Sequence, residues 1–304
     1  MPRKGGPIQK RPIANVDKVI VVASGKGGVG KSTVALNLAF ALALRKNERM
    51  NTPLRVGLLD LDIFGPSIPT LMGLRNAGEP ALSSGGAILP MTNHGLPCMS
   101  MGFLLPSTNS ASLEENDNTD TPIVWRGLMV QKAVQQLLFD VDWSKDGNGL
   151  DVLVVDMPPG TGDVPLTLGQ LVTVDGSVIV STPQDVALSD VRKGIAMLRK
   201  VSVPITGLIL NQAYYLCPGC GTGIPRYLFG KPDNFNNVAQ KLDVPVLGEL
   251  PLVEGVSSGA DAGYPYVLSS IDAVKSSDGE GGLTWRSNMA QVAEKVAASL
   301  WKTS

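Results

Sequence analysis

A glycine-rich run that carries two lysines has the clearest chemistry in this sequence. GKGGVGKST fits the P-loop pattern, in which a second glycine, a lysine and a hydroxyl residue follow the first glycine at fixed spacing. Glycines let successive backbone N–H groups face one anion, and a following helix adds the partial positive charge of its N-terminus. We therefore expect Lys31 to neutralise the β- and γ-phosphates and Ser32 to ligate Mg²⁺. The predicted phosphate-binding residues are Gly25, Lys26, Gly27, Gly28, Val29, Gly30, Lys31, Ser32 and Thr33.

Carboxylates at the ends of two apolar runs are the next candidates. Asp156 closes DVLVVD, where a carboxylate can reach the Mg²⁺ shell. Asp60 and Asp62 end the run RVGLLDLD and lie two residues apart, so both face the same side of an extended chain. One of them would orient the attacking water, and a helix cap or a turn is the alternative interpretation of Asp62. The predicted catalytic residues are Lys26, Lys31, Asp60, Asp62 and Asp156.

An asparagine is a candidate for recognising the nucleotide base. Asn211 follows the apolar run at 205–210, and its amide offers both a donor and an acceptor to a purine edge. A loop-forming asparagine is the alternative interpretation. Asn211 alone does not distinguish adenine from guanine.

The second lysine of the glycine-rich run suggests a role between two chains. Lys31 already serves the phosphates, so Lys26 is not needed for that purpose in its own chain. We hypothesise that two protomers meet face to face and that each Lys26 contacts the nucleotide of the other, as an arginine finger does.

Two cysteines have metal-ligand spacing. Cys217 and Cys220 form C-x-x-C, whereas a tetrahedral zinc site or an iron–sulfur cluster usually has four protein ligands. Cys98 lies in an apolar run and is expected to be a buried structural thiol, and His94 to be an ordinary polar loop residue. One chain therefore supplies half a site, which a symmetric dimer would complete. The spacing leaves zinc and iron–sulfur both open, with a redox disulfide as a third possibility.

Alternating strands and helices must position these residues. Apolar runs predict strands at 19–23, 55–61, 98–103, 151–157, 177–181 and 205–210, and helical patterns fall at 32–45, 127–139, 186–200, 234–242 and 285–301. This alternation predicts an α/β fold, with a doubly wound, mostly parallel sheet of about seven strands and helices on both faces.

Composition narrows the partners and the domain organisation. A net charge of −1 argues against a broad nucleic-acid-binding surface. No apolar run approaches the ~18 residues that span a bilayer, so we expect no stable membrane insertion. Residues 1–17 predict a basic extended arm, and 18–304 a single domain with flexible loops near 107–120 and 275–282.

Further motifs carry a family resemblance. The lysine at Lys26 makes the P-loop resemble the deviant Walker A of the MinD/ParA superfamily. DLDIFGPSIP, CMSMGFL, VWRGLMV, DMPPGTGD, STPQDVAL, CPGCG and LFG occur in the same order as in Mrp-type P-loop iron–sulfur carriers, and are most similar to the mitochondrial NUBPL-like branch. The resemblance covers about residues 11–300.

The resemblance implies a function and a compartment. It implies a weak ATPase that uses ATP and Mg²⁺ and carries a labile 4Fe-4S cluster across a homodimer. Apoprotein recipients would include respiratory complex I subunits. The implied location is the mitochondrial matrix, although no transit peptide is evident in the sequence, and the cytoplasm otherwise. The alternative function is a MinD/ParA-like ATPase switch with a structural zinc knuckle.

One stretch departs from the family pattern. At 253–265 the sequence reads VEGVSSGADAGYP, with Ser257 and Ser258 where relatives usually carry an arginine and a glutamate.

Overall fold

The computed structural model describes residues 9–46, 52–104, 127–144, 147–220 and 223–301 of the chain. The strands are β1 (Val16–Ser24), β2 (Val56–Asp60), β3 (Met91–Asn93), β4 (Leu96–Ser100), β5 (Leu150–Asp156), β6 (Gly176–Ser181), β7 (Gly207–Leu210) and β8 (Val246–Glu249). The α-helices are α1 (Lys31–Ala43), α2 (Ile68–Leu71), α3 (Gly127–Phe139), α4 (Asp163–Leu171), α5 (Asp185–Lys200), α6 (Asp233–Lys241), α7 (Glu254–Asp261), α8 (Ile271–Ser277) and α9 (Gly279–Leu300). Two 3₁₀ turns are η1 (Met101–Phe103) and η3 (Tyr266–Leu268).

The described strands form one sheet in the order β3-β4-β2-β5-β1-β6-β7-β8. Every neighbouring pair is parallel except β3 with β4, which is an antiparallel hairpin at one edge. The central strands β1 and β5 are in register from Val16 with Leu150 to Val22 with Asp156. The predicted α/β sheet is thus correct in kind, with eight strands instead of about seven.

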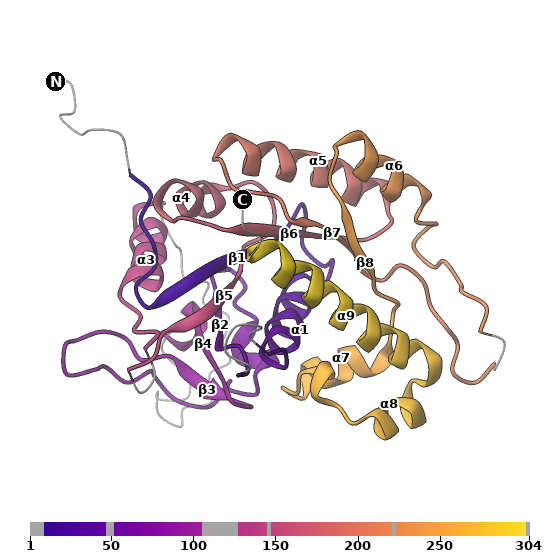
Figure 1. Ribbon diagram of the computed structural model, residues 1–304, viewed down its shortest axis with the longest axis horizontal. Coiled ribbons are helices and arrows are strands. Elements are labelled where there is room, and N and C mark those ends of the chain that lie inside the picture. The colour runs from indigo at the N-terminus through magenta and orange to yellow at the C-terminus, as the bar shows by residue number, and fades with distance from the viewer. Residues whose placement is uncertain (1–8, 47–51, 105–126, 145–146, 221–222, 302–304) are drawn as a thin grey trace, which may run out of the picture.

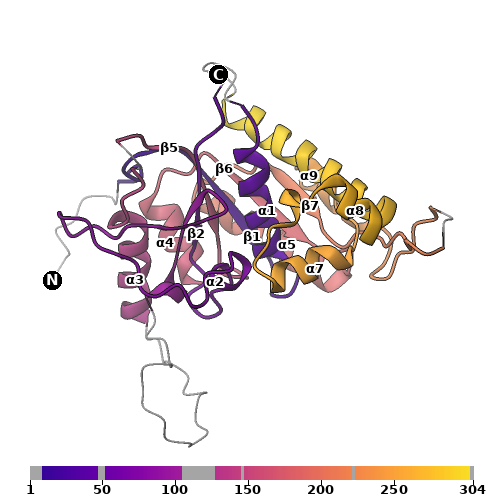
Figure 2. The same cartoon turned by 90° about the horizontal axis from the view of Figure 1, so that it is seen from below.

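Helices cover both faces of the sheet. In Figure 1, α4, α5 and α6 lie on one side, and α1 and α9 on the other. Figure 2, from below, places α1 and α9 in front of the strands. Coverage on both sides explains why β2, β5, β6 and β7 are buried at every residue and why their sequences are mostly apolar. Within the described ranges, no helix is long and apolar enough to cross a membrane.

The prediction of a flexible loop at 275–282 is wrong. This stretch contains the end of α8 and the start of α9, with Asp278 between them. The Asp278 carboxylate is buried and accepts hydrogen bonds from the Tyr266 hydroxyl at 2.7 Å and the Gly255 amide at 3.0 Å. A side chain at Gly282 would collide with Tyr266. The glycines here permit close packing, so their abundance does not indicate flexibility.

The basic arm packs partly on the domain. Residues 1–8 lie outside the described residues, but Arg11 exchanges backbone hydrogen bonds with Leu171 and Thr173 at the end of α4. The Arg11 guanidinium lies 3.5 Å from the centre of the Phe139 ring, and Ile13 is buried. The sheet begins at Val16, before the predicted boundary. The predicted loop at 107–120 falls outside the described residues.

Trp285 is the structural anchor of α9. Its side chain is buried, and its ring meets the Tyr266 ring edge-on at 5.3 Å. We expect Trp285→Ala to lower the free energy of unfolding by about 3–5 kcal/mol, because a large cavity would remain. Urea denaturation measures this change. Gln291→Ala, on the exposed side of the same helix, should shift the free energy by less than about 0.5 kcal/mol. Equal losses of unfolding free energy in Trp285→Ala and Gln291→Ala would contradict the role of Trp285 as the anchor of α9.

Candidate nucleotide and cysteine site

The candidate site lies where the parallel strands end. β1, β2, β5 and β7 all present their carboxyl ends at the same edge of the sheet, which is where ligands bind in open α/β folds. This edge therefore brings together the P-loop, which follows Ser24, with Asp60, Asp156 and Asn211.

The P-loop has the backbone that its glycines allow. Gly28 and Gly30 have φ angles of 78° and 81°, in the left-handed region that side chains disfavour. Gly30 is the N-cap of α1, and its carbonyl accepts the first helical hydrogen bond, from Val34 at 2.9 Å. A Cβ at Gly25 would overlap the backbone of Asp190 in α5. The loop is thus held between α1 and α5.

Lys31 and Asp156 form a buried ion pair across the site. Their Nζ and Oδ1 atoms are 2.6 Å apart, and the side chains are 6% and 0% exposed. Burial raises the pKa of Asp156, and the Lys31 charge opposes this shift. The Lys31 ammonium also lies 3.1 Å from the Ser32 hydroxyl.

The second carboxylate oxygen of Asp156 indicates a cation site. Among the described residues, Asp156 Oδ2 is buried and has no hydrogen-bond partner. An orphaned carboxylate oxygen and a serine hydroxyl are oxygen ligands of the kind Mg²⁺ prefers. Asp156 and Ser32 therefore fit the predicted Mg²⁺, directly or through water.

Asp60 fixes the loop that follows β2. It is fully buried, and its carboxylate accepts hydrogen bonds from the Asp62 amide at 2.9 Å, the Ser100 hydroxyl at 2.9 Å and the Ile68 amide at 3.3 Å. Burial, followed by the charge of Asp156, raises the pKa of Asp60 to about 7. Both oxygens are thus occupied by donors of its own chain.

Asp62 lines a cavity between two loops. The cavity, of about 330 Å³, also takes walls from Phe64, Pro158, Pro159 and Asp163, so the loops after β2 and β5 meet there. Burial raises the pKa of the Asp62 carboxyl, while Lys31 lowers it. The carboxylate also accepts from the Phe64 and Gly65 amides. Asp62 therefore forms a turn and faces the space where a water could be oriented.

Lys26 finds a partner that the sequence analysis missed. Its Nζ donates to Gln184 Oε1 at 3.0 Å, and its carbonyl accepts from the Ser24 hydroxyl at 2.9 Å. Gln184 is the N-cap residue of α5 and lies within the motif STPQDVAL, which was the available signal. The two lysines of the P-loop thus have separate partners.

Asn211 clamps the P-loop. Its side-chain amide donates to the Val29 carbonyl at 2.9 Å, and its backbone amide to Ser181 at 2.8 Å. A Cβ at Gly30 would collide with the same amide group. One N–H of the amide that was assigned to a purine is therefore engaged with the loop, and base recognition stays a prediction.

The cysteine pair follows Asn211 after a short stretch of chain. Cys217 is half-buried and Cys220 exposed. A hydrogen bond with Cys220 is the main cause of the lowered pKa of Cys217, with the Gly219 amide contributing. Pro218 packs near Gly279, so the loop abuts the start of α9.

The other candidate ligands lie elsewhere. Cys98 is fully buried in β4, and burial raises its pKa to about 12, so the predicted structural thiol is confirmed. His94 Nε2 lies 2.9 Å from the Gly263 carbonyl. The part of the chain that the structure describes contains no group of three or more His, Cys, Asp or Glu side chains able to hold a metal ion.

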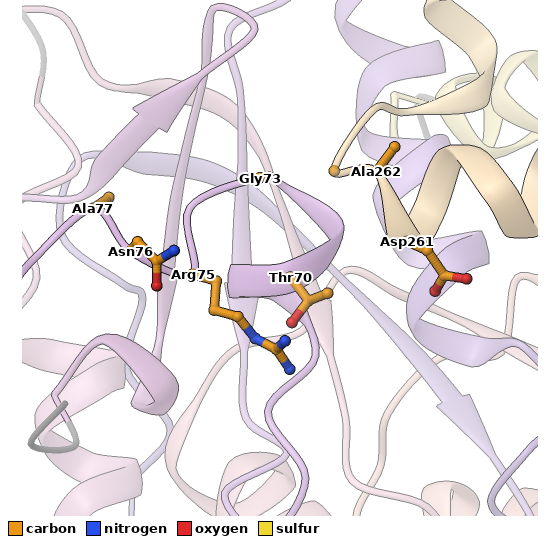
Figure 3. Close-up of a pocket in the computed structure, with 8 residues that line it drawn as sticks. Thr70, Gly73, Arg75, Asn76, Ala77, Asp261 and Ala262 are labelled. Atoms are coloured by element: carbon orange, nitrogen blue, oxygen red, sulfur yellow. The ribbon is translucent and has the colours of Figure 1, made fainter. Parts of the chain in front are cut away.

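A second cavity lies away from the P-loop. It measures about 360 Å³, and Figure 3 shows Thr70 and Arg75 on one wall with Asp261 and Ala262 from the end of α7 on another. The stretch that departs from the family pattern forms α7 and thus lines this cavity.

Comparison with known proteins identifies the family. The protein-family model described as ParA: NUBPL iron-transfer P-loop NTPase matches residues 15–280 of this chain. The chain belongs to this family. The family predicted from the sequence motifs is therefore confirmed.

Three relatives from other organisms are named as iron–sulfur proteins. The mouse iron–sulfur cluster transfer protein NUBPL is 49% identical over 88% of this chain and 75% of its own length. An Arabidopsis thaliana iron–sulfur protein required for NADH dehydrogenase, mitochondrial, is 43% identical over 90% of this chain and 78% of its own. The iron–sulfur cluster carrier protein of Escherichia coli K12 is 40% identical over 95% of this chain and 68% of its own.

Solved structures agree in fold. A nucleotide-binding protein from Archaeoglobus fulgidus in complex with ADP has a TM-score of 0.64 and 34% identity, covering 83% of this chain and 88% of its own. MinD from Pyrococcus horikoshii, complexed with Mg-ADP, has a TM-score of 0.57 at 19% identity, with coverages of 94% and 99%. The second likeness concerns the fold alone.

The raised pKa of Asp60 predicts a pH dependence of stability. The native carboxyl holds its proton up to about pH 7, whereas the unfolded chain releases it near 3.8, so stability is lost as pH rises through this window. Asp60→Asn removes the titration, and its stability relative to wild type should rise by at most about 1.4 kcal/mol per pH unit. Urea denaturation from pH 4 to pH 8 measures the difference. Asp233→Asn, at the exposed start of α6, is the control, and parallel curves for wild type and Asp60→Asn would refute the assignment.

Proposed function

We propose that this protein is an ATP-dependent iron–sulfur carrier that holds a labile 4Fe-4S cluster across a homodimer and delivers it to apoproteins. The observation that carries the proposal is a solvent-accessible thiol pair, Cys217 and Cys220, on a segment tied to the P-loop through Asn211. The recipients would include subunits of respiratory complex I, and the location would be the mitochondrial matrix. The similarity to the mouse iron–sulfur cluster transfer protein supports the cargo, and the similarity to the Arabidopsis mitochondrial protein required for NADH dehydrogenase supports the recipients and the location.

The cysteine count supports a shared site. The chain has three cysteines, and Cys98 is buried inside the sheet. A cluster with four thiolate ligands therefore needs Cys217 and Cys220 from two chains. Such a cargo is retained while the two chains are closed and is released when they separate.

Two hydrogen bonds connect the P-loop and α1 to elements near the cysteine segment. Asn211 holds the Val29 carbonyl, and only five residues separate Asn211 from Cys217. Asn37 of α1 accepts a hydrogen bond from the Val267 amide of η3 at 3.0 Å, and the neighbouring Tyr266 hydroxyl donates to Asp278 at the α8–α9 junction. Phosphate binding that moves the P-loop or α1 would thus shift the cysteines, which is how ATP could bias closure.

The residues of the P-loop edge would perform hydrolysis. Lys31 would neutralise phosphate charge, and Ser32 and Asp156 would hold Mg²⁺, which would supply Lewis-acid stabilisation of the phosphates. Asp62 is placed to orient water in the cavity between the loops, while Asp60 positions the Asp62 backbone. A slow ATPase is sufficient for a carrier, because one hydrolysis event would open or close the dimer once for each delivered cluster.

Anaerobic reconstitution tests the cargo. We expect about four irons for every two chains, with broad visible absorption, because two thiol pairs complete one cluster. Cys217→Ser and Cys220→Ser should lose the iron, whereas Cys98→Ala should retain it, since Cys98 is buried away from the pair. Iron and zinc analysis with absorption spectroscopy measures the result. One tightly held zinc per two chains without visible absorption would instead indicate an ATPase switch with a structural zinc knuckle.

Substitution of Lys26 tests the action across the dimer. Lys26→Ala should lose ATP-dependent dimerisation and at least about tenfold in hydrolysis rate, with nucleotide affinity largely kept, because Lys31 remains. Analytical ultracentrifugation, phosphate release and nucleotide titration measure the three quantities. Gln184→Ala is the matched control, since it removes the partner of Lys26 within the chain and leaves the lysine. Hydrolysis that is unchanged in Lys26→Ala would reject the role.

A further inference from the structure

One antiparallel bridge joins the chain on either side of the cysteines, and we call the paired segments around Tyr215 and Arg226 the ribbon. Tyr215 and Arg226 exchange backbone hydrogen bonds in both directions, each 2.9 Å long. Residues in such an antiparallel pair place their side chains on the same face of the ribbon. The neighbouring pair, Tyr214 and Tyr227, is on the opposite face, where the two rings meet edge-on at 6.4 Å.

The same geometry puts a cysteine beside the arginine. Cys217 lies two residues after Tyr215, and alternate residues of an extended chain share a face. Tyr215, Cys217 and Arg226 therefore line one side of the ribbon. The hydrogen bond between the two thiols is the main influence on their pKa values, which lowers the pKa of Cys217 and raises that of Cys220, and the Arg226 charge makes a smaller contribution that favours the thiolate form of each. The Tyr215 hydroxyl is also within hydrogen-bonding reach of Cys217.

Arg226 has no competing partner of opposite charge. It is exposed, and within the described ranges no carboxylate forms an ion pair with it. Its guanidinium is therefore available to the thiol pair.

We propose that Arg226 is a positioning residue for the cargo, which balances the negative charge of the two thiolates and of the cluster bound to them. The inference rests on the proposed carrier function and deepens it. A 4Fe-4S core of charge +2 with four thiolates carries a net charge of about −2. Two chains contribute two Arg226 side chains, so the closed dimer would offset this charge.

The charge has two measurable consequences. A nearby cation favours thiolate over thiol, so it speeds alkylation of the metal-free cysteines at a fixed pH. A cation also favours the more negative, reduced form of a cluster, so its removal lowers the reduction potential and weakens retention.

The experiment compares Arg226→Gln with Arg226→Lys and Lys231→Gln. Lys231→Gln is the matched control, because it removes one exposed positive charge five residues away. Iodoacetamide alkylation of the metal-free cysteines should slow about two- to fivefold in Arg226→Gln, as expected of one exposed charge. After anaerobic reconstitution, iron loss to a ferrous chelator should become faster by a similar factor, and the cluster potential should fall. Arg226→Lys should restore both, and Lys231→Gln should match wild type.

The outcomes separate this inference from the carrier function. Arg226→Gln that matches Lys231→Gln in alkylation, chelation and potential would overturn the role of Arg226 and leave the carrier function standing. A wild-type protein that takes up no iron while Arg226→Gln still slows alkylation would reject the cluster cargo. In that case the link between Arg226 and the thiol pair would be supported.

Discussion

The ion pair between Lys31 and Asp156 is the constraint on which the site depends. It joins the start of α1 to the end of β5 and lies in a dry environment, where either charge alone would be strongly destabilising. A nucleotide whose phosphates engaged Lys31 would leave Asp156 without its ion-pair partner. A cation or a proton at Asp156 would compensate for this loss, which agrees with the Mg²⁺ that we propose for the site. Because the pair also holds the P-loop against the sheet edge, any change in the partner of Lys31 reaches the backbone around it.

The P-loop and its helix are joined by direct hydrogen bonds to two segments that lie later in the chain. Asn211 donates to the Val29 carbonyl and begins the segment that carries Cys217. Asn37, in the second turn of α1, donates to the Thr33 carbonyl and accepts from the Val267 amide in η3. These contacts are the structural basis of the coupling that we propose between the nucleotide and the cargo.

Sequence patterns predicted most of this arrangement, because the P-loop, the buried strands and the long helices are encoded locally. The short edge strands β3 and β8 were missed, since three or four residues carry too little periodicity. The helical junction at 275–282 was misjudged because its glycines and serines have the composition of a loop, whereas burial of Asp278 decides its structure. The roles of Gln184 and Arg226 were missed, because their pairings connect segments that only the folded chain brings together, and the motif STPQDVAL marks Gln184 without showing its partner Lys26.

The contact between Pro218 and Gly279 has a consequence for how the chain can be divided. The cysteine loop rests on the first turn of α9, a helix that starts about sixty residues later and is fixed by Asp278 and Trp285. The same helix belongs to the core, since Trp285, Met289 and Val292 are buried and α9 packs against α1, which begins at the P-loop. A fragment that stopped short of this helix would therefore lose core packing together with the support of the cysteine loop. The P-loop helix and the cysteine loop thus rest on one common element, and truncation before α9 is expected to unfold the domain instead of separating the two.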